Sequence, residues 1–62
     1  MERMRELRKK REMTQEDLAR RLHVSQQSIA KWENGNTMPR ADKLAACAKA
    51  LRCSVDALLR TK

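Results

Sequence analysis

The chain has 62 residues, which is enough for one domain with a small core. It carries 15 Lys and Arg against 8 Asp and Glu, a net charge of +7 at pH 7, and this balance favours a polyanionic partner such as nucleic acid or an anionic membrane surface. No apolar run approaches the roughly 18 residues that span a bilayer, and charged residues follow Met1 where a secretion signal would be apolar, so we expect a soluble, cytoplasmic protein.

The order of the apolar residues predicts a folded chain. Leu, Ile, Val and Phe number ten of 62 residues, which with a net charge of +7 is typical of disordered chains. Against disorder, the full apolar content is 40% and the apolar residues recur at helical spacing. The β-branched residues are scattered, so no segment has the pattern of a strand. The sequence therefore predicts a compact all-α fold of five helices that forms a single domain over residues 1–62.

The first predicted helix covers residues 2–11. Met1, Met4 and Leu7 recur along one face at helical spacing, so we expect this face to pack on the core. The other face is basic and carries Arg3, Arg5, Lys9, Lys10 and Arg11. These charges exceed what the fold requires, and auxiliary contact with phosphate groups is a hypothesis for them.

The second predicted helix, residues 15–22, follows a capping residue. The hydroxyl of Thr14 can accept the backbone N–H of Asp17, whose carboxylate can reach back to the amide of Thr14. Met13 and Leu18 are spaced as a hydrophobic staple, which sets the angle at which the chain enters the helix. These local signals predict where the helix begins.

The third predicted helix, residues 25–34, follows after a very short connection. A three-residue turn at 23–25 makes consecutive helices cross at a large angle. Gly35 ends the helix, because glycine readily takes the left-handed conformation. On a helical wheel the side expected to pack inward holds Ser25, Ile29, Trp32 and Glu33.

Two shorter patterns predict helices over residues 41–51 and 54–60. The first has a core-facing stripe of Leu44, Cys47, Ala48 and Leu51. Its N-cap is not evident, because Arg40 is a poor capping residue. For the second, Cys53, Ser54 and Leu58 repeat the spacing of Met13, Thr14 and Leu18, with Ser54 a good capping residue at its start.

Cysteine and histidine usage argues against a metal centre and against catalysis. Cys47 and Cys53 are the two cysteines, and no further Cys or His pair could complete a zinc site. In a cytosolic protein two such residues are more often small buried groups than a disulfide. With one His, no Tyr and no glycine-rich phosphate loop, the chain offers no catalytic grouping. We expect neither an enzyme nor a bound metal or cofactor.

The outward side of the third helix carries residues that suit the edges of DNA bases. Gln and Asn amides can bond adenine, Lys reaches guanine, and an Ala methyl packs on the thymine methyl. The predicted base-contacting residues are Gln26, Gln27, Ala30 and Lys31, and Asn34 lies on the same side. The simplest alternative is that these residues only solvate an exposed helix face. The short preceding turn, the capped helix before it and the basic groups on both flanks favour DNA binding.

Several segments together resemble the phage Cro and repressor type of helix-turn-helix family, an XRE-like group of transcriptional regulators. They are residues 14–19 (TQEDLA), 24–29 (VSQQSI), 32–35 (WENG) and 51–59 (LRCSVDALL), joined by Pro39 and Leu44. The resemblance covers nearly the whole chain. It implies a compact five-helix domain whose second and third helices form the helix-turn-helix.

The resemblance also implies roles outside the base-reading side. Phosphate contacts are implied for Gln15, Asn34, Asn36, Thr37, Arg40 and Lys43, and Gln15 is implied to brace the first Gln of the third helix. Arg8 and Glu33 are implied to form a structural ion pair. The resemblance implies a dimer, and because the sequence displays no separate oligomerisation domain, we expect the contact on the last predicted helix, with Val55, Leu58 and Leu59 as candidates. The alternatives are helix termination for Asn34 and ordinary surface charge for Arg40 and Lys43.

Three positions depart from the family's pattern. Glu12, His23 and Arg52 occupy turns where glycine is common, so we expect modest backbone strain there. The predicted function is sequence-specific binding of double-stranded DNA by a dimer on a near-palindromic operator, as a transcriptional repressor or regulator of phage or mobile-element type. A protein-interaction module that uses the same helices is the competing interpretation. RNA binding lacks an aromatic stacking platform.

Overall fold

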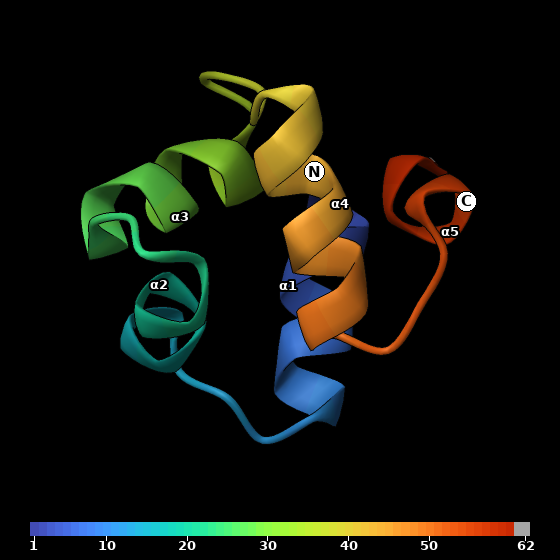
Figure 1. Ribbon diagram of the computed structural model, residues 1–62, viewed down its shortest axis with the longest axis horizontal. Coiled ribbons are helices and arrows are strands. Elements are labelled where there is room, and N and C mark those ends of the chain that lie inside the picture. Colours follow the sequence, from blue (N-terminus) through green and yellow to red (C-terminus); the bar gives the residue numbers. More distant parts are fainter. Residues whose placement is uncertain (61–62) are drawn as a thin grey trace.

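The computed structural model describes residues 1–60, which form five α-helices and no strand (Figure 1). The helices are α1 (Glu2–Lys10), α2 (Gln15–Leu22), α3 (Gln26–Asn34), α4 (Ala41–Ala50) and α5 (Val55–Leu59). The predicted all-α fold with five helices is confirmed. Residues 61 and 62, the last two of the predicted domain, lie outside the described residues.

The observed helices are slightly shorter than expected at five of their ends. Ser25 and Ser54 have extended backbone angles and act as caps rather than as first helical residues. Arg11 and Leu51 have ψ angles of 7° and 1°, outside the helical range, so α1 and α4 each end one residue earlier. Arg60 is extended and lies just beyond α5.

Side-chain caps start three of the five helices. The hydroxyl of Thr14 accepts the N–H of Asp17 at 3.0 Å, and the carboxylate of Asp17 accepts the N–H of Thr14 at 2.9 Å. Ser25 and Ser54 each accept the backbone N–H three residues along, at 3.1 and 3.0 Å. The cap position of α4 is Arg40, whose side chain makes no such bond. The α2–α3 turn is thereby held by a cap at the start of each of its helices.

Left-handed residues close the turns between helices. Gly35 ends α3 with φ of 80°, as expected. Glu12, His23 and Arg52 have φ of 56°, 57° and 57°, so the three departures from the family's glycine pattern do adopt the strained conformation.

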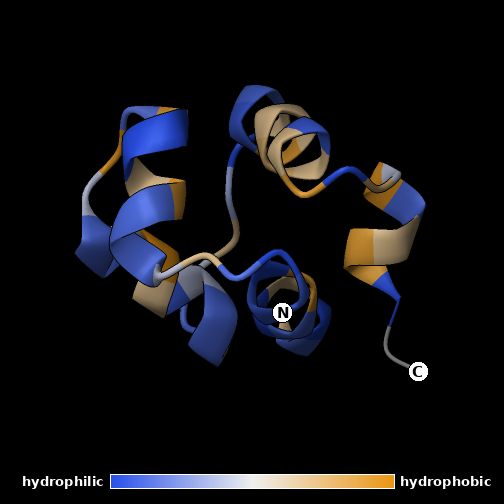
Figure 2. Cartoon of the chain, turned by 90° about the horizontal axis from the view of Figure 1, so that it is seen from below, coloured by the Kyte–Doolittle hydropathy of each residue, from blue (hydrophilic) through white to orange (hydrophobic). Residues whose placement is uncertain are grey.

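The core lies where all five helices converge. Packing joins α2 to α3 and α4, and joins α1 to α3 and α5, with α4 also against α5. The buried apolar side chains are Met4, Leu18, Ala19, Leu22, Ile29, Trp32, Cys47, Ala48, Leu51 and Leu58. Figure 2 shows hydrophilic residues over most of the outward turns of the helices. This packing holds α3 at the surface with one face free.

Candidate nucleic-acid interface

The outward face of α3 brings together the four residues predicted to contact bases. Their positions along the helix place them on one side, and they are Gln26, Gln27 and Lys31, which are exposed, and Ala30, which is half-buried. On the opposite side Ile29, Trp32 and Glu33 are at most 8% exposed. Ser25, expected on the inward side, is exposed instead, because its hydroxyl caps the helix.

The N-terminal end of α3 suits an electron-rich partner. Its first turn contains no acidic residue, so the free backbone N–H groups and the positive end of the helix dipole face no carboxylate of their own helix. The two glutamines stand at this end, and Lys31 follows in the last turn. A nucleic acid approaching α3 therefore meets amide donors and acceptors, and a cation.

A buried ion pair joins the C-terminal end of α3 to α1. Arg8 donates from Nε to Oε2 of Glu33 at 2.6 Å and from Nη2 to Oε1 at 3.2 Å, and its Nη1 donates to the carbonyl of Met13 at 2.7 Å. The side chains of Arg8 and Glu33 are 9% and 0% exposed. Burial of Glu33 favours its neutral form, but hydrogen bonds from Arg8 and Gln15 and the charge of Arg8 outweigh burial and lower its pKa. The structure thus brings the two residues of the implied pair together.

Arg5 adds a second guanidinium to this site, which the sequence did not indicate. Its Nε lies 3.4 Å from Oε1 of Glu33, and its Nη2 donates to Oδ1 of Asn34 at 2.8 Å. The only sequence signal was the general basicity of the first helix. Arg5 therefore engages the carbonyl side of the Asn34 amide, although Asn34 itself is exposed.

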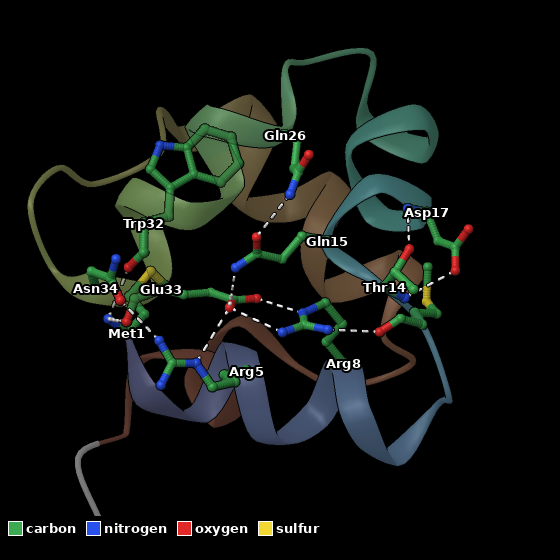
Figure 3. A network of polar contacts seen from close by, with 11 residues as sticks. Met1, Arg5, Arg8, Thr14, Gln15, Asp17, Gln26, Trp32, Glu33 and Asn34 are labelled. Atoms are coloured by element: carbon green, nitrogen blue, oxygen red, sulfur yellow. Dashed lines mark hydrogen bonds and ion pairs between the residues drawn. The ribbon is translucent and has the colours of Figure 1, made fainter.

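The ion pair is linked to the surface through two glutamines (Figure 3). Gln15, which is half-buried, donates from Nε2 to Oε1 of Glu33 at 3.1 Å. Gln26 donates from Nε2 to Oε1 of Gln15 at 3.3 Å. A continuous hydrogen-bond chain therefore runs from α1 through the end of α3 and the start of α2 to the exposed face of α3.

The remaining residues implied to contact phosphates occupy two environments. Asn36, Thr37 and Arg40 are exposed in the connection between α3 and α4. Lys43 is half-buried, and its Nζ donates to the carbonyl of Leu22 at 2.9 Å. Lys43 therefore satisfies a carbonyl at the C-terminal end of α2 in this structure.

The residues implied to form a dimer contact are divided between core and surface. Leu58 is 1% exposed and belongs to the core of its own protomer, whereas Leu59 is 45% exposed and Val55 is half-buried. The side chain of Leu58 is thus occupied within the domain. Met38, not anticipated from the sequence, is 59% exposed and lines with Met1, Leu58 and Leu59 a groove of about 380 Å³.

Three further features of residues 1–60 concern membrane spans, metal sites and thiols. None of the helices there is long and apolar enough to cross a membrane. No three His, Cys, Asp or Glu side chains among the same residues are grouped so as to hold a metal ion. Cys47 is buried and burial raises its pKa to about 12, and Cys53 is half-buried, so neither is an activated thiolate.

A capped helix, a short turn and a second helix with one exposed polar face define a helix-turn-helix domain. The sequence profile of the helix-turn-helix family matches residues 4–58, and the chain belongs to this family. The resemblance drawn from the sequence is thereby confirmed. No solved structure matches the chain in the corresponding comparison.

Curated proteins similar to this chain are named as transcription regulators. The HTH-type transcriptional activator BcrR of Enterococcus faecalis is 38% identical over 94% of the chain, and repressor protein C2 of Salmonella phage P22 is 42% identical over 95%. The HTH-type transcriptional regulator DicA of Escherichia coli (strain K12) is 42% identical over 86%. The chain spans only 28%, 27% and 39% of these proteins, respectively.

Proposed function

We propose that this domain binds double-stranded DNA sequence-specifically and regulates transcription, with α3 inserted in the major groove. The observation that carries this proposal is the exposed face of α3, where Gln26, Gln27, Ala30 and Lys31 stand together above a buried, fully bonded support. These side chains complement base edges, and the turn before α3 presents its N-terminal half as in other helix-turn-helix domains. The activity proposed is binding and not catalysis.

Phosphate contacts on both sides of α3 would set its orientation. Asn36, Thr37 and Arg40 lie in the connection that follows α3, and Gln15 lies at the start of α2 with its amide beside Gln26. Asn34 and Lys43 complete the proposed set. Asn34 would bind a phosphate through its amide nitrogen, because its amide oxygen accepts from Arg5. Lys43 would bind a phosphate after breaking its bond to the carbonyl of Leu22. Such contacts position the protein on the duplex without reading its sequence.

A dimer on a near-palindromic operator is the form in which we expect the domain to act. Two copies would place their α3 helices in half-sites about 34 Å apart, and repression would follow from occupancy of the operator. Leu59 and Met38 supply exposed apolar surface for the contact, with Val55 beside it. The protein would work in the cytoplasm, where it meets its DNA.

Selection of bound duplexes from a random pool at near-physiological salt tests the proposal. We expect the wild-type chain to enrich a short inverted repeat, and the Gln26→Ala/Gln27→Ala variant to lose or relax it. Both glutamines are exposed, so unchanged melting of the variant serves as the folding control. Salt-sensitive retention of all duplexes without enrichment would instead favour a protein-interaction module with a basic surface.

The dimer contact has its own test. Leu59→Glu places a charge on exposed surface and should weaken dimerisation on the operator while leaving the fold intact, as measured by sedimentation on a half-site and on a full site. Unchanged cooperativity on the full site would move the contact away from α5.

A further inference from the structure

We propose that Glu33, a residue that does not face the DNA, sets which base Gln26 prefers. It does so by fixing which end of the Gln15 amide, oxygen or nitrogen, faces Gln26. This inference rests on the proposed function. It assigns Glu33 as a positioning residue for specificity, in addition to its place in the ion pair with Arg8.

The Glu33 carboxylate is surrounded by hydrogen-bond donors. Its side chain is 0% exposed and receives N–H groups from Arg8, Arg5 and Gln15 at distances of 2.6 to 3.4 Å. An ionised carboxylate accepts hydrogen bonds and donates none. The surrounding guanidinium groups keep it in that form, so every partner of Glu33 must present a donor.

This requirement orients Gln15. An amide side chain can be turned so that either its oxygen or its nitrogen faces a given neighbour, but only the nitrogen can bond the carboxylate. Gln15 therefore points Nε2 at Glu33, at 3.1 Å, and Oε1 toward α3. Gln15 thus presents the acceptor atom Oε1 to Gln26 (Figure 3).

The acceptor on Gln15 in turn orients Gln26. Gln26 uses one N–H of Nε2 to bond Gln15, which leaves Oε1 and the second N–H for a base. One acceptor and one donor match the N6 amino group and the N7 atom of adenine. If Gln15 were reversed, Gln26 would give up its oxygen and keep two N–H groups, which match the O6 and N7 acceptors of guanine.

Two variants release the polarity by different routes. Arg8→Met/Glu33→Met removes the carboxylate together with its buried counter-charge, and Gln15→Met removes the intermediate amide while keeping the ion pair. At the operator position facing Gln26, we expect the preference for adenine over guanine to fall from roughly 5-fold or more toward even in both. Arg5→Met is the matched control, because it removes one donor to Glu33 but leaves the carboxylate, so the base preference should stay whatever happens to overall affinity.

The readout separates this inference from the proposed function and from a merely structural role. A structural role for Glu33 would lower affinity for all sequences alike, whereas the inference requires a change at one position. Enrichment by the wild type without a preference for adenine at that position, or with the same preference kept in Arg8→Met/Glu33→Met, would overturn the inference and leave the proposed function standing. Failure of the wild type to enrich any sequence would overturn both.

Nuclear magnetic resonance of the free protein tests the chain without DNA. The side-chain amide signals of Gln26 should shift in the Arg8→Met/Glu33→Met and Gln15→Met variants and stay in place in Arg5→Met. Gln26 signals that stay in place in Arg8→Met/Glu33→Met would show that Glu33 does not orient Gln26, even if they shift in Gln15→Met.

Discussion

At the scale of single residues, Arg8 and Glu33 form the buried ion pair of the domain. Both side chains are at most 9% exposed, and Glu33 alone serves donors from α1 and α2. Glu33→Ala should lower the free energy of unfolding by about 3–5 kcal/mol, because it leaves the guanidinium of Arg8 buried without a counter-charge. Urea denaturation measures this change. Arg8→Met/Glu33→Met should cost less than Glu33→Ala, and a larger cost would mean that the pair is net favourable beyond its desolvation.

Replacing a left-handed residue by glycine should stabilise the domain. His23 closes α2 with φ of 57°, a conformation that is unfavourable for a residue with a Cβ. His23→Gly should raise the free energy of unfolding by up to about 1 kcal/mol, reduced from the full relief of strain by the added freedom of glycine in the unfolded chain. Calorimetry would show this as a rise in Tm.

Gly35→Ala is the matched control for that change. Gly35 has φ of 80° with open space around its missing Cβ, so alanine meets backbone strain and no steric neighbour. It should lower stability by about 1–2 kcal/mol. Substitutions with the same sign at the two positions would contradict the strain interpretation.

At the scale of the elements, α4 differs from α2, α3 and α5 in its start. Those three begin with a hydroxyl cap, whereas Arg40 offers no side-chain bond to the first turn of α4. Its backbone already has the extended angles of a capping residue. Arg40→Ser should therefore stabilise the domain by about 1 kcal/mol while lowering DNA affinity, because Arg40 is a proposed phosphate contact.

The two effects of Arg40→Ser are measured separately by thermal melting and by titration with operator DNA. Ser54→Ala makes the reverse change at α5, where the hydroxyl accepts the N–H of Ala57, and should cost about 1 kcal/mol. A stabilised Arg40→Ser variant with wild-type affinity would remove Arg40 from the interface.

At the scale of the whole molecule, carboxylates make the stability depend on pH. The pKa of Glu33 lies below its ordinary value of 4.5, because bonds from Arg8 and Gln15 outweigh the opposing effect of burial. The pKa of Asp17 lies below 3.8 because it accepts the backbone N–H of Thr14. Both groups stabilise the fold above their unfolded pKa values, and this contribution is lost as the pH falls through the lower folded values.

Unfolding in urea at a series of pH values measures this loss. Stability should decline as the pH is lowered below about 4.5, and the decline should be shallower in Arg8→Met/Glu33→Met, which keeps only the contribution of Asp17. An identical decline in the variant would mean that the pKa of Glu33 is the same in the folded and unfolded protein.

The charge of the whole chain predicts how DNA binding responds to salt. With a net charge of +7, affinity should fall steeply as salt rises, and each lost cationic phosphate contact should reduce the logarithmic slope by about 0.9. Arg40→Ala is expected to show that reduction, and Gln27→Ala is expected to show none because it is neutral. Lys43→Met tests two roles of Lys43. Loss of a phosphate contact would reduce the salt slope, whereas loss of the observed bond to Leu22 would lower the stability.

The sequence by itself determined the class of fold, the starts of three helices and the turns between them. Thr14, Ser25 and Ser54 cap amides three residues away, and Gly35 closes its own helix, so the controlling interactions are local and readable along the chain. Only tertiary structure decided that Leu58 is core and Leu59 surface, that Lys43 bonds Leu22, and that Arg5 joins Glu33. These outcomes depend on how the helices cross and on which long side chains reach from one helix to another. The same holds for the hydrogen bonds by which Gln26 donates to Gln15 and Gln15 donates to Glu33, because they join different helices and no spacing within one helix encodes them.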